Sequence, residues 1–150
     1  MGGEAWSYFV PYEKNINTAL QKLREQEFKA GRYNKRNVKG KPASIDEVLS
    51  CCDAEGSRSI LDMMEVIKTP HERPTDEDMG FSLDPDRLAR VAPLKSEDVE
   101  ELFGTDKPNH AQVEKGHDLF EWINRGEGVY LIVYKDAKPH EIYFAGFSFD

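Results

Sequence analysis

Long hydrophobic runs and a signal peptide are both missing from the sequence. No apolar stretch approaches the ~18 residues that a membrane-spanning helix requires. The amino terminus, MGGEAWSYFV, lacks the basic start and the small-residue cleavage site of a secretory leader. We therefore expect a cytoplasmic protein with no membrane partner. At 150 residues, 39% of them hydrophobic, the chain is most simply one globular domain spanning 1–150.

Cysteine is scarce, and its placement excludes two common kinds of site. The only two cysteines, Cys51 and Cys52, are adjacent, whereas disulfide frameworks and zinc sites need separated pairs. Helical spacing from Ile45 through Val48 puts Cys52 on an apolar stripe, so we interpret it as a structural core residue.

Positive charge is in deficit, because the chain has 20 Lys and Arg against 28 Asp and Glu, a net charge of −8. This balance argues against nucleic-acid binding, which needs clustered cations to neutralise phosphates. It favours a basic protein partner instead. The alternative is that the acidity only keeps the protein soluble.

The sequence also lacks the motifs of the common catalytic sites. It contains no Gly-x-Ser-x-Gly, no P-loop, no dinucleotide-binding glycine pattern and no His-Glu-x-x-His. His110, Glu114, His117 and Glu121 share one face of a predicted helix, but that face lies away from the apolar residues and is interpreted as solvent-exposed. We predict neither a metal site nor a cofactor, and we favour a binding protein over an enzyme.

Local patterns predict an alternation of strands and helices. A strand at 5–12 near a sheet edge is followed by helices from Asn15 to Gly31 and from Ser44 to Gly56, and by a strand at 57–68. Helices from Ser96 and from Asn109 come next, and the chain ends in a hairpin at 128–150 that turns at 136–139. The order predicts an α+β domain with a mostly antiparallel sheet of about four strands. Three to four helices are expected to pack on one face.

Two loops stand out from these elements. Residues 32–41 form a basic loop with five Lys or Arg and no acid. Residues 69–93 form a long, acidic loop that contains four prolines. Loops of this length are commonly functional or mobile, and the sequence does not choose between the two.

Glu27 is the most unusual residue in the predicted helices. It shares the apolar stripe of Leu20 and Leu23, and a buried carboxylate requires a cation or hydrogen-bond donors. The nearest candidates are Arg32, the Tyr33 hydroxyl and Arg36. One interpretation, which we favour, is a structural ion pair. The other is a polar pocket in which Arg32 holds an anionic group and Glu27 acts as a base or acceptor.

The carboxy-terminal hairpin is apolar on both faces, so its strands are either central in the sheet or reserve one face for a partner. Tyrosine is a common anchor at protein interfaces. The predicted partner-binding residues are three tyrosines and four acids: Tyr130, Tyr134, Tyr143, Glu72, Asp76, Glu77 and Asp78.

These features lead to three hypotheses. The first is an inhibitor, immunity or antitoxin-type protein that engages a basic partner. The alternative is a small enzyme or ligand-binding domain with a pocket for an anionic small molecule near Glu27, Arg32, Tyr33 and Arg36. A third is a scaffold subunit that uses its last strand to extend another sheet.

Overall fold

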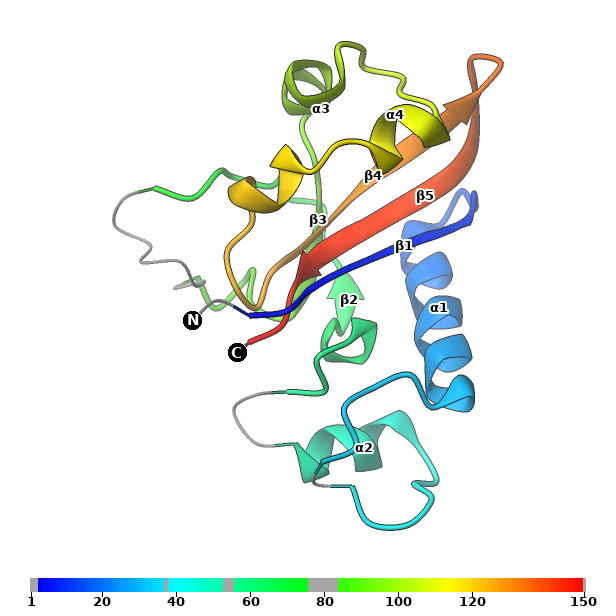
Figure 1. Ribbon diagram of the computed structural model, residues 1–150, viewed down its shortest axis with the longest axis vertical. Coiled ribbons are helices and arrows are strands. Elements are labelled where there is room, and N and C mark those ends of the chain that lie inside the picture. The colour runs from blue at the N-terminus through cyan, green and yellow to red at the C-terminus, as the bar shows by residue number, and fades with distance from the viewer. Residues whose placement is uncertain (1–2, 37, 53–55, 76–83, 150) are drawn as a thin grey trace.

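The computed structural model describes residues 3–36, 38–52, 56–75 and 84–149 (Figure 1). Its elements, in chain order, are β1 (Ala5–Pro11), α1 (Ile16–Ala30), α2 (Ile45–Cys51), the 3-10 helix η1 (Ile60–Asp62), β2 (Glu65–Val66), β3 (Arg90–Pro93), α3 (Ser96–Phe103), α4 (His110–Glu114), the 3-10 helix η2 (Asp118–Trp122), β4 (Gly128–Lys135) and β5 (Lys138–Phe147). The predicted α+β class is confirmed.

The five strands form one mixed sheet in the order β1-β5-β4-β3-β2. β5 pairs antiparallel with β1 and with β4, whereas β3 pairs parallel with β4 and β2. The prediction of about four mostly antiparallel strands is therefore close but incomplete. The extra strand, β3, lies inside the segment predicted to be a loop at 69–93. With only four residues it is too short to show an alternating pattern.

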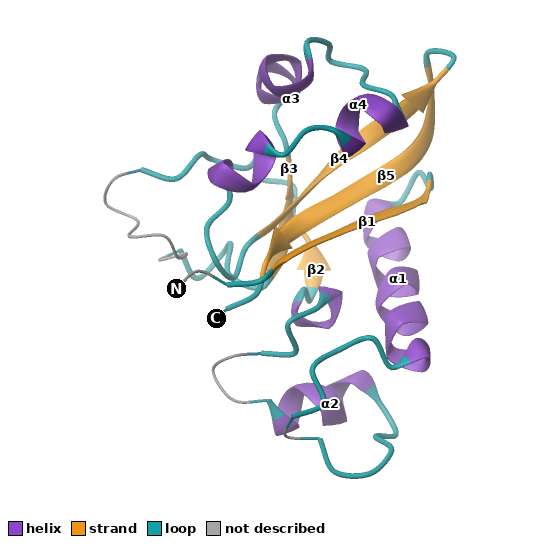
Figure 2. Ribbon diagram, in the orientation of Figure 1, coloured by secondary structure: helices purple, strands orange, loops and turns teal. Residues whose placement is uncertain are grey.

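Helices cover both faces of the sheet, so the prediction that they pack on one face was wrong (Figure 2). α1 and η1 cover one face, and α3, α4 and η2 cover the other. β4 and β5 are central, and alternate residues along them enter the two cores. Their two-sided apolar pattern follows from this position. Because β5 lies between β1 and β4, the last strand has no edge with which to extend another sheet.

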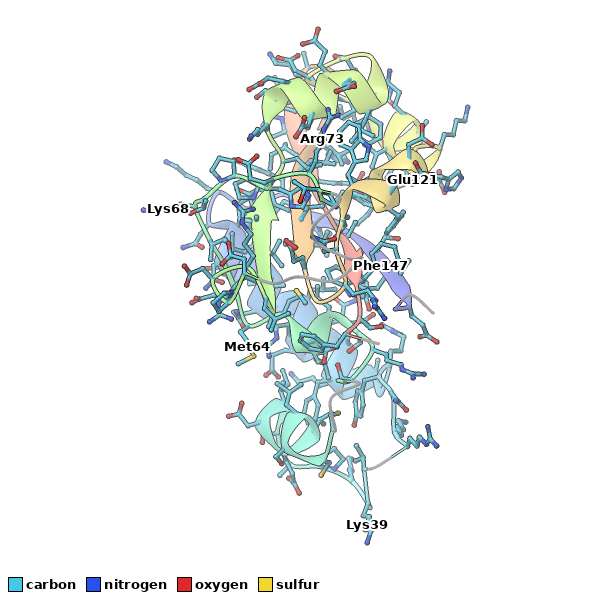
Figure 3. All side chains as sticks on the ribbon, turned by 90° about the vertical axis from the view of Figure 1, so that its left-hand side faces the viewer. Lys39, Met64, Lys68, Arg73, Glu121 and Phe147 are labelled. Atoms are coloured by element: carbon cyan, nitrogen blue, oxygen red, sulfur yellow. The ribbon has the colours of Figure 1, made fainter. Side chains whose placement is uncertain are left out.

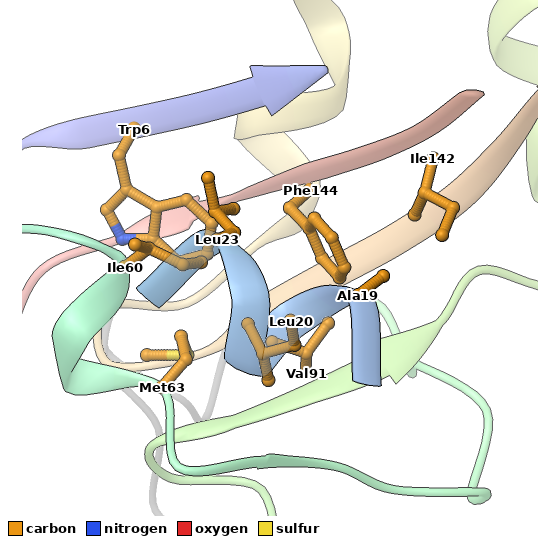
Figure 4. Close-up of a cluster of buried hydrophobic side chains, with 9 residues drawn as sticks. All are labelled: Trp6, Ala19, Leu20, Leu23, Ile60, Met63, Val91, Ile142 and Phe144. Carbon is orange, nitrogen blue, oxygen red and sulfur yellow. The ribbon is translucent and has the colours of Figure 1, made fainter. Parts of the chain in front are cut away.

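The core beneath α1 is built around Trp6 (Figure 4). The Trp6 indole packs against two glycines, Gly128 and Gly146. Gly146 is opposite Trp6 in β1 and opposite Gly128 in β4. A Cβ atom added at Gly128 would lie 2.9 Å from the Trp6 ring, and one at Gly146 would also meet the indole. The two glycines therefore make room for the largest side chain of this core.

Helix ends follow the sequence signals closely. Asn15, Ser44 and Asn109 each cap a helix, and Asn109 forms the predicted capping box with Gln112. Gly31 ends α1 in the left-handed region, with φ of 71°.

Three predicted elements are shorter than expected. The strand at 57–68 is reduced to η1 and the two residues of β2, and the helix from Asn109 ends at Glu114 before η2 begins. The predicted helix from Ser44 to Gly56 ends at Cys51. Cys52 is half-buried rather than in the core, with its Sγ 3.2 Å from the Val48 carbonyl oxygen.

The first part of the predicted 69–93 loop is packed against η2 and α3. His71 is buried, and its Nε2 lies 2.7 Å from the carbonyl oxygen of Trp122. The Arg73 guanidinium stacks 3.6 Å from the centre of the Trp122 ring and contacts Asp98 at 2.9 Å. Residues 69–75 are thus held against η2 and α3 by the contacts of two side chains, the buried imidazole of His71 and the guanidinium of Arg73.

Candidate functional site

The carboxyl end of α1 carries the ion pair that the sequence suggested. Gly31 reverses the chain, and Arg32 donates its backbone N–H to the Glu27 carbonyl at 3.0 Å. Its guanidinium then meets the Glu27 carboxylate, with Nε at 2.7 Å and Nη2 at 2.6 Å from Oε2. Glu27 is 4% exposed, whereas the Arg32 side chain is 59% exposed. The hydrogen bond that Arg32 donates to this carboxylate raises the pKa of Arg32.

A hollow of about 740 Å³ opens beside this ion pair, between the end of α1 and residues 38–43. We call it the cationic hollow because Lys29, Lys35 and Lys41 line it. Its aromatic wall consists of Phe28 and Tyr33, whose rings are nearly parallel with centroids 6.2 Å apart. Ammonium groups beside an aromatic wall can hold an anion that also has an apolar part.

A second hollow, of about 370 Å³, adjoins the first at Tyr33. We call it the arginine hollow, since Arg32 and Arg58 line it together with Asn34 and Glu4. Glu4 is the single acid among the described lining residues of both hollows. Its carboxylate lies 3.9 Å from Arg58 Nη1.

Arg58 reaches this position through a turn that a buried carboxylate fixes. Asp62, 3% exposed, accepts hydrogen bonds from the backbone N–H of Ser57 at 2.6 Å and of Arg58 at 3.1 Å. Arg58 adopts a positive φ of 53° in this turn. Burial raises the pKa of Asp62. A further bond, from Asn34 N–H to the Ser57 carbonyl at 2.8 Å, joins the turn to the basic loop.

Charge is distributed unevenly along the long axis of the molecule. Residues 29–41 carry six Lys or Arg and no acid, whereas residues 96–121 carry eight Asp or Glu and two Lys. The first segment lies at the α2 end, where Lys39 is found, and the second forms the α3 and α4 end (Figures 1 and 3). Because α2 at the same end carries Asp46 and Glu47, the positive charge there is confined to residues 29–41.

The sequence matches no protein-family model, and the searches of curated proteins and of solved structures found no significant match.

The predicted ligand residues are only partly brought together. Glu27 and Arg32 are paired, and Tyr33 borders both hollows. Arg36 is exposed, lines neither hollow, and donates its backbone N–H to the Asn34 side chain at 3.0 Å. The residues that sequence reasoning missed are Phe28, Lys29, Asn34, Lys35, Lys41 and Arg58. Lys35 and Lys41 were visible as part of the basic loop at 32–41, whereas nothing in the sequence links Lys29 or Arg58 to a site there.

The predicted partner-binding acids do not form a described surface. Glu72 pairs with Lys95 at 2.9 Å, and this contact lowers the pKa of Glu72. Asp76, Glu77 and Asp78 lie outside the described residues.

The three predicted tyrosine anchors are divided between the faces of the sheet. Tyr143 is 5% exposed in the core beneath α4, with its ring 4.6 Å from that of Phe9. Tyr130 is half-buried against the core beneath α1. Tyr134 is also half-buried, next to an irregularity in the β4–β5 register, with Lys107 Nζ 5.9 Å from the centre of its ring. Tyr143 and Tyr130 therefore lie on opposite faces of the sheet and cannot form one surface.

The polar stripe of the predicted helix from Asn109 is divided, because α4 ends at Glu114. His110 stacks on Phe9 with centroids 3.9 Å apart, and its Nδ1 lies 2.8 Å from Glu141 Oε1. The described residues contain no cluster of three His, Cys, Asp or Glu side chains arranged to hold a metal ion. Within the same residues, no helix combines the length and the apolar character needed to cross a bilayer.

Proposed function

We propose that this protein binds an anionic small molecule in the cationic hollow and the adjoining arginine hollow. The observation that carries the proposal is the convergence of five cationic side chains on these two hollows: Lys29, Lys35, Lys41, Arg32 and Arg58. They come from separate parts of a chain whose net charge is −8. The larger hollow is within the range of about 300 to 1,000 Å³ that is typical of small-molecule sites.

The two kinds of cation have different roles in this proposal. The exposed lysines attract the anion as mobile point charges. Arg32 is oriented by Glu27, which engages its Nε and Nη2 and turns Nη1 into the proposed donor to a carboxylate or phosphate oxygen. Glu27 is then a positioning residue for Arg32 rather than a base. Tyr33 lines both hollows, so a ligand that extends from one hollow into the other would contact its ring.

Glu4 opposes an incoming anion and provides a sensitive test. Its carboxylate lies beside Arg58 on the rim of the arginine hollow. Replacing Glu4 with Gln removes one negative charge from the site without changing the shape of the side chain. We expect affinity for a small anion to rise by about threefold, the effect of one unit charge at several ångströms in water. An unchanged affinity would place the ligand away from Arg58.

Nuclear magnetic resonance mapping tests the location directly, with inorganic pyrophosphate as the probe and citrate as a second anion. At constant ionic strength, saturable shifts should concentrate on the amides of Tyr33, Asn34 and Arg58. Shifts scattered over all exposed lysines would show an unspecific ion atmosphere and would contradict the proposal.

A second candidate function is the engagement of a basic protein partner, as an inhibitor, immunity or antitoxin-type protein does. It is favoured by the acidic end formed by residues 96–121, in which Glu97, Glu100 and Glu101 are exposed. Capture from native cell extract at low and high salt would test it. A stoichiometric basic partner lost on Glu97→Gln and Glu100→Gln substitution would support this function, and recovery of the bait alone would oppose it. The cytoplasmic location stays a prediction from the sequence.

A further inference from the structure

β1 forms one edge of the sheet and has a neighbouring strand on one side only, β5. In the described part of the chain, no other element pairs with its outer side (Figure 1). The strand and the following residue read AWSYFVPY, eight residues without a charged side chain in a protein that is 32% charged.

The direction of the backbone groups on β1 follows from its bonds to neighbouring residues. Ser148 donates its N–H to the Glu4 carbonyl at 2.9 Å, and Tyr12 donates to the His140 carbonyl at 3.0 Å. Because antiparallel residues alternate, the even-numbered residues of β1 face β5 and the odd-numbered ones face outward. Ala5, Ser7 and Phe9 therefore direct both N–H and C=O away from the sheet. Pro11 is also outward, where its missing N–H costs nothing.

Edge strands of soluble proteins are normally protected by lysines, by prolines, by bulges or by covering segments. β1 has a proline at its end only, and its register against β5 runs from Ala5 to Pro11 without a bulge. The outward backbone N–H and C=O groups of residues 5–10 are thus available to pair with another strand, and no charged side chain in this segment opposes the pairing.

We infer that a second copy of this chain pairs its β1 antiparallel to this edge, across a twofold axis at Ser7. In that register Ala5 lies opposite Phe9 of the partner subunit, and Ser7 lies opposite Ser7 of the partner subunit. All three outward N–H groups of each copy then find an outward carbonyl. Closed twofold dimers of this kind are the commonest protein assemblies.

Charge and side-chain pairing favour a second copy on this edge. Two chains of net charge −8 repel each other overall, but in this register residues 5–12 of one copy place no charged side chain opposite a like charge in the other. Glu4 falls opposite Val10 of the partner subunit. Tyr8, half-buried, falls opposite Trp6 of the partner subunit at a non-hydrogen-bonded position, where side chains approach most closely. The pairing does not depend on the ligand proposed above.

Cysteine cross-linking tests the register. In a Cys51→Ser, Cys52→Ser background, Ser7→Cys should form a disulfide dimer on mild oxidation, because facing hydrogen-bonded residues have Cα atoms roughly 5.5 Å apart, within disulfide range. The matched control on the same edge is Pro11→Cys, which has no self-facing partner in this register. Equal cross-linking of both variants, or none of Ser7→Cys, would overturn the inference.

Sedimentation equilibrium of the unmodified chain tests the dimer itself. The mass should rise towards two copies with concentration and should not fall between about 50 mM and 500 mM salt, since salt screens the repulsion of like net charges. Ser7→Pro removes an outward N–H that β5 does not use, and Ser7→Lys places like charges on the axis; both should be folded monomers. A monomer at every concentration, or a dimer retained by folded Ser7→Lys, would refute the pairing.

Discussion

His71 is buried neutral, and the stability of the protein should therefore depend on pH below about 6.5, the ordinary pKa of histidine. Its side chain is 1% exposed, and its Nε2 donates to the Trp122 carbonyl at 2.7 Å. Burial is the main cause that lowers the pKa of His71, and Arg87 adds to it. The Trp122 carbonyl, Asp98 and Glu72 oppose the shift without reversing it.

The sign of the effect follows from proton binding in the two states. Below pH 6.5 the unfolded chain takes up a proton at His71 that the folded chain does not. The contribution of His71 to the free energy of unfolding is thus fully present above pH 6.5. It is lost as the pH falls from 6.5 towards the lowered pKa of His71 in the folded protein. The loss is at most about 1.4 kcal/mol per pH unit, the linkage value for one proton.

Replacing His71 with Gln removes this titration and keeps an N–H donor for the Trp122 carbonyl. At pH 7.5 we expect the variant to lose about 1 to 3 kcal/mol, because its side chain fits the buried site imperfectly. Urea unfolding followed by tryptophan fluorescence should show that this difference shrinks at pH 5.5. Exposed His117→Gln is the matched control. An equal pH dependence in the wild type and in His71→Gln would refute the reasoning.

Three other predictions concern stability. Gly146→Ala should cost roughly 1 to 3 kcal/mol in urea unfolding, because the new methyl group would meet the Trp6 ring and the Glu127 carbonyl; an unchanged midpoint would contradict that packing. Asn15→Ala should cost about 1 kcal/mol in the same assay through loss of the cap on Thr18 N–H, and no loss would mean that water replaces the cap. Arg73→Gln should lower the melting temperature, because it removes the contacts of Arg73 to Asp98, Glu101 and the Trp122 ring. The decrease should be smaller in high salt, which screens the two ion pairs; a decrease that does not depend on salt would mean that only the stacking on Trp122 contributes to stability.

Elements with local signals could be predicted from the sequence. The caps at Asn15, Ser44 and Asn109 are formed by side chains within three residues of the N–H groups they bind. The β4–β5 hairpin needs only a short turn at Asp136 and Ala137.

Elements that depend on distant contacts could not be predicted in this way. β3 exists because Val91 and Ala92 pair with β4, far along the chain. The helix from Asn109 breaks near Gly116, where the Phe103 ring of α3 occupies the space of a side chain.

The same difference between local and distant contacts applies to the residues of the candidate site. Glu27 and Arg32 are five residues apart, so helical geometry was enough to suggest their pairing. Arg58 joins them only because Asp62 fixes its turn and Asn34 bonds to Ser57. These are contacts between segments that the sequence alone does not bring together. The partner-binding set was chosen by residue type, which is why it combined the buried Tyr143 with the half-buried Tyr130.

The most direct test of the proposed function is calorimetric titration of pyrophosphate into two variants that carry the same change in net charge. Lys35→Gln with Lys41→Gln empties the cationic hollow of two ammonium groups, whereas Lys115→Gln with Lys138→Gln changes exposed lysines elsewhere. We predict that the first pair weakens binding roughly tenfold, the effect of two unit charges near the anion, and that the second pair leaves it within about twofold of the wild type, since distant charges are screened. Equal weakening by both pairs, or wild-type protein that binds no pyrophosphate, would contradict an anion site in this hollow.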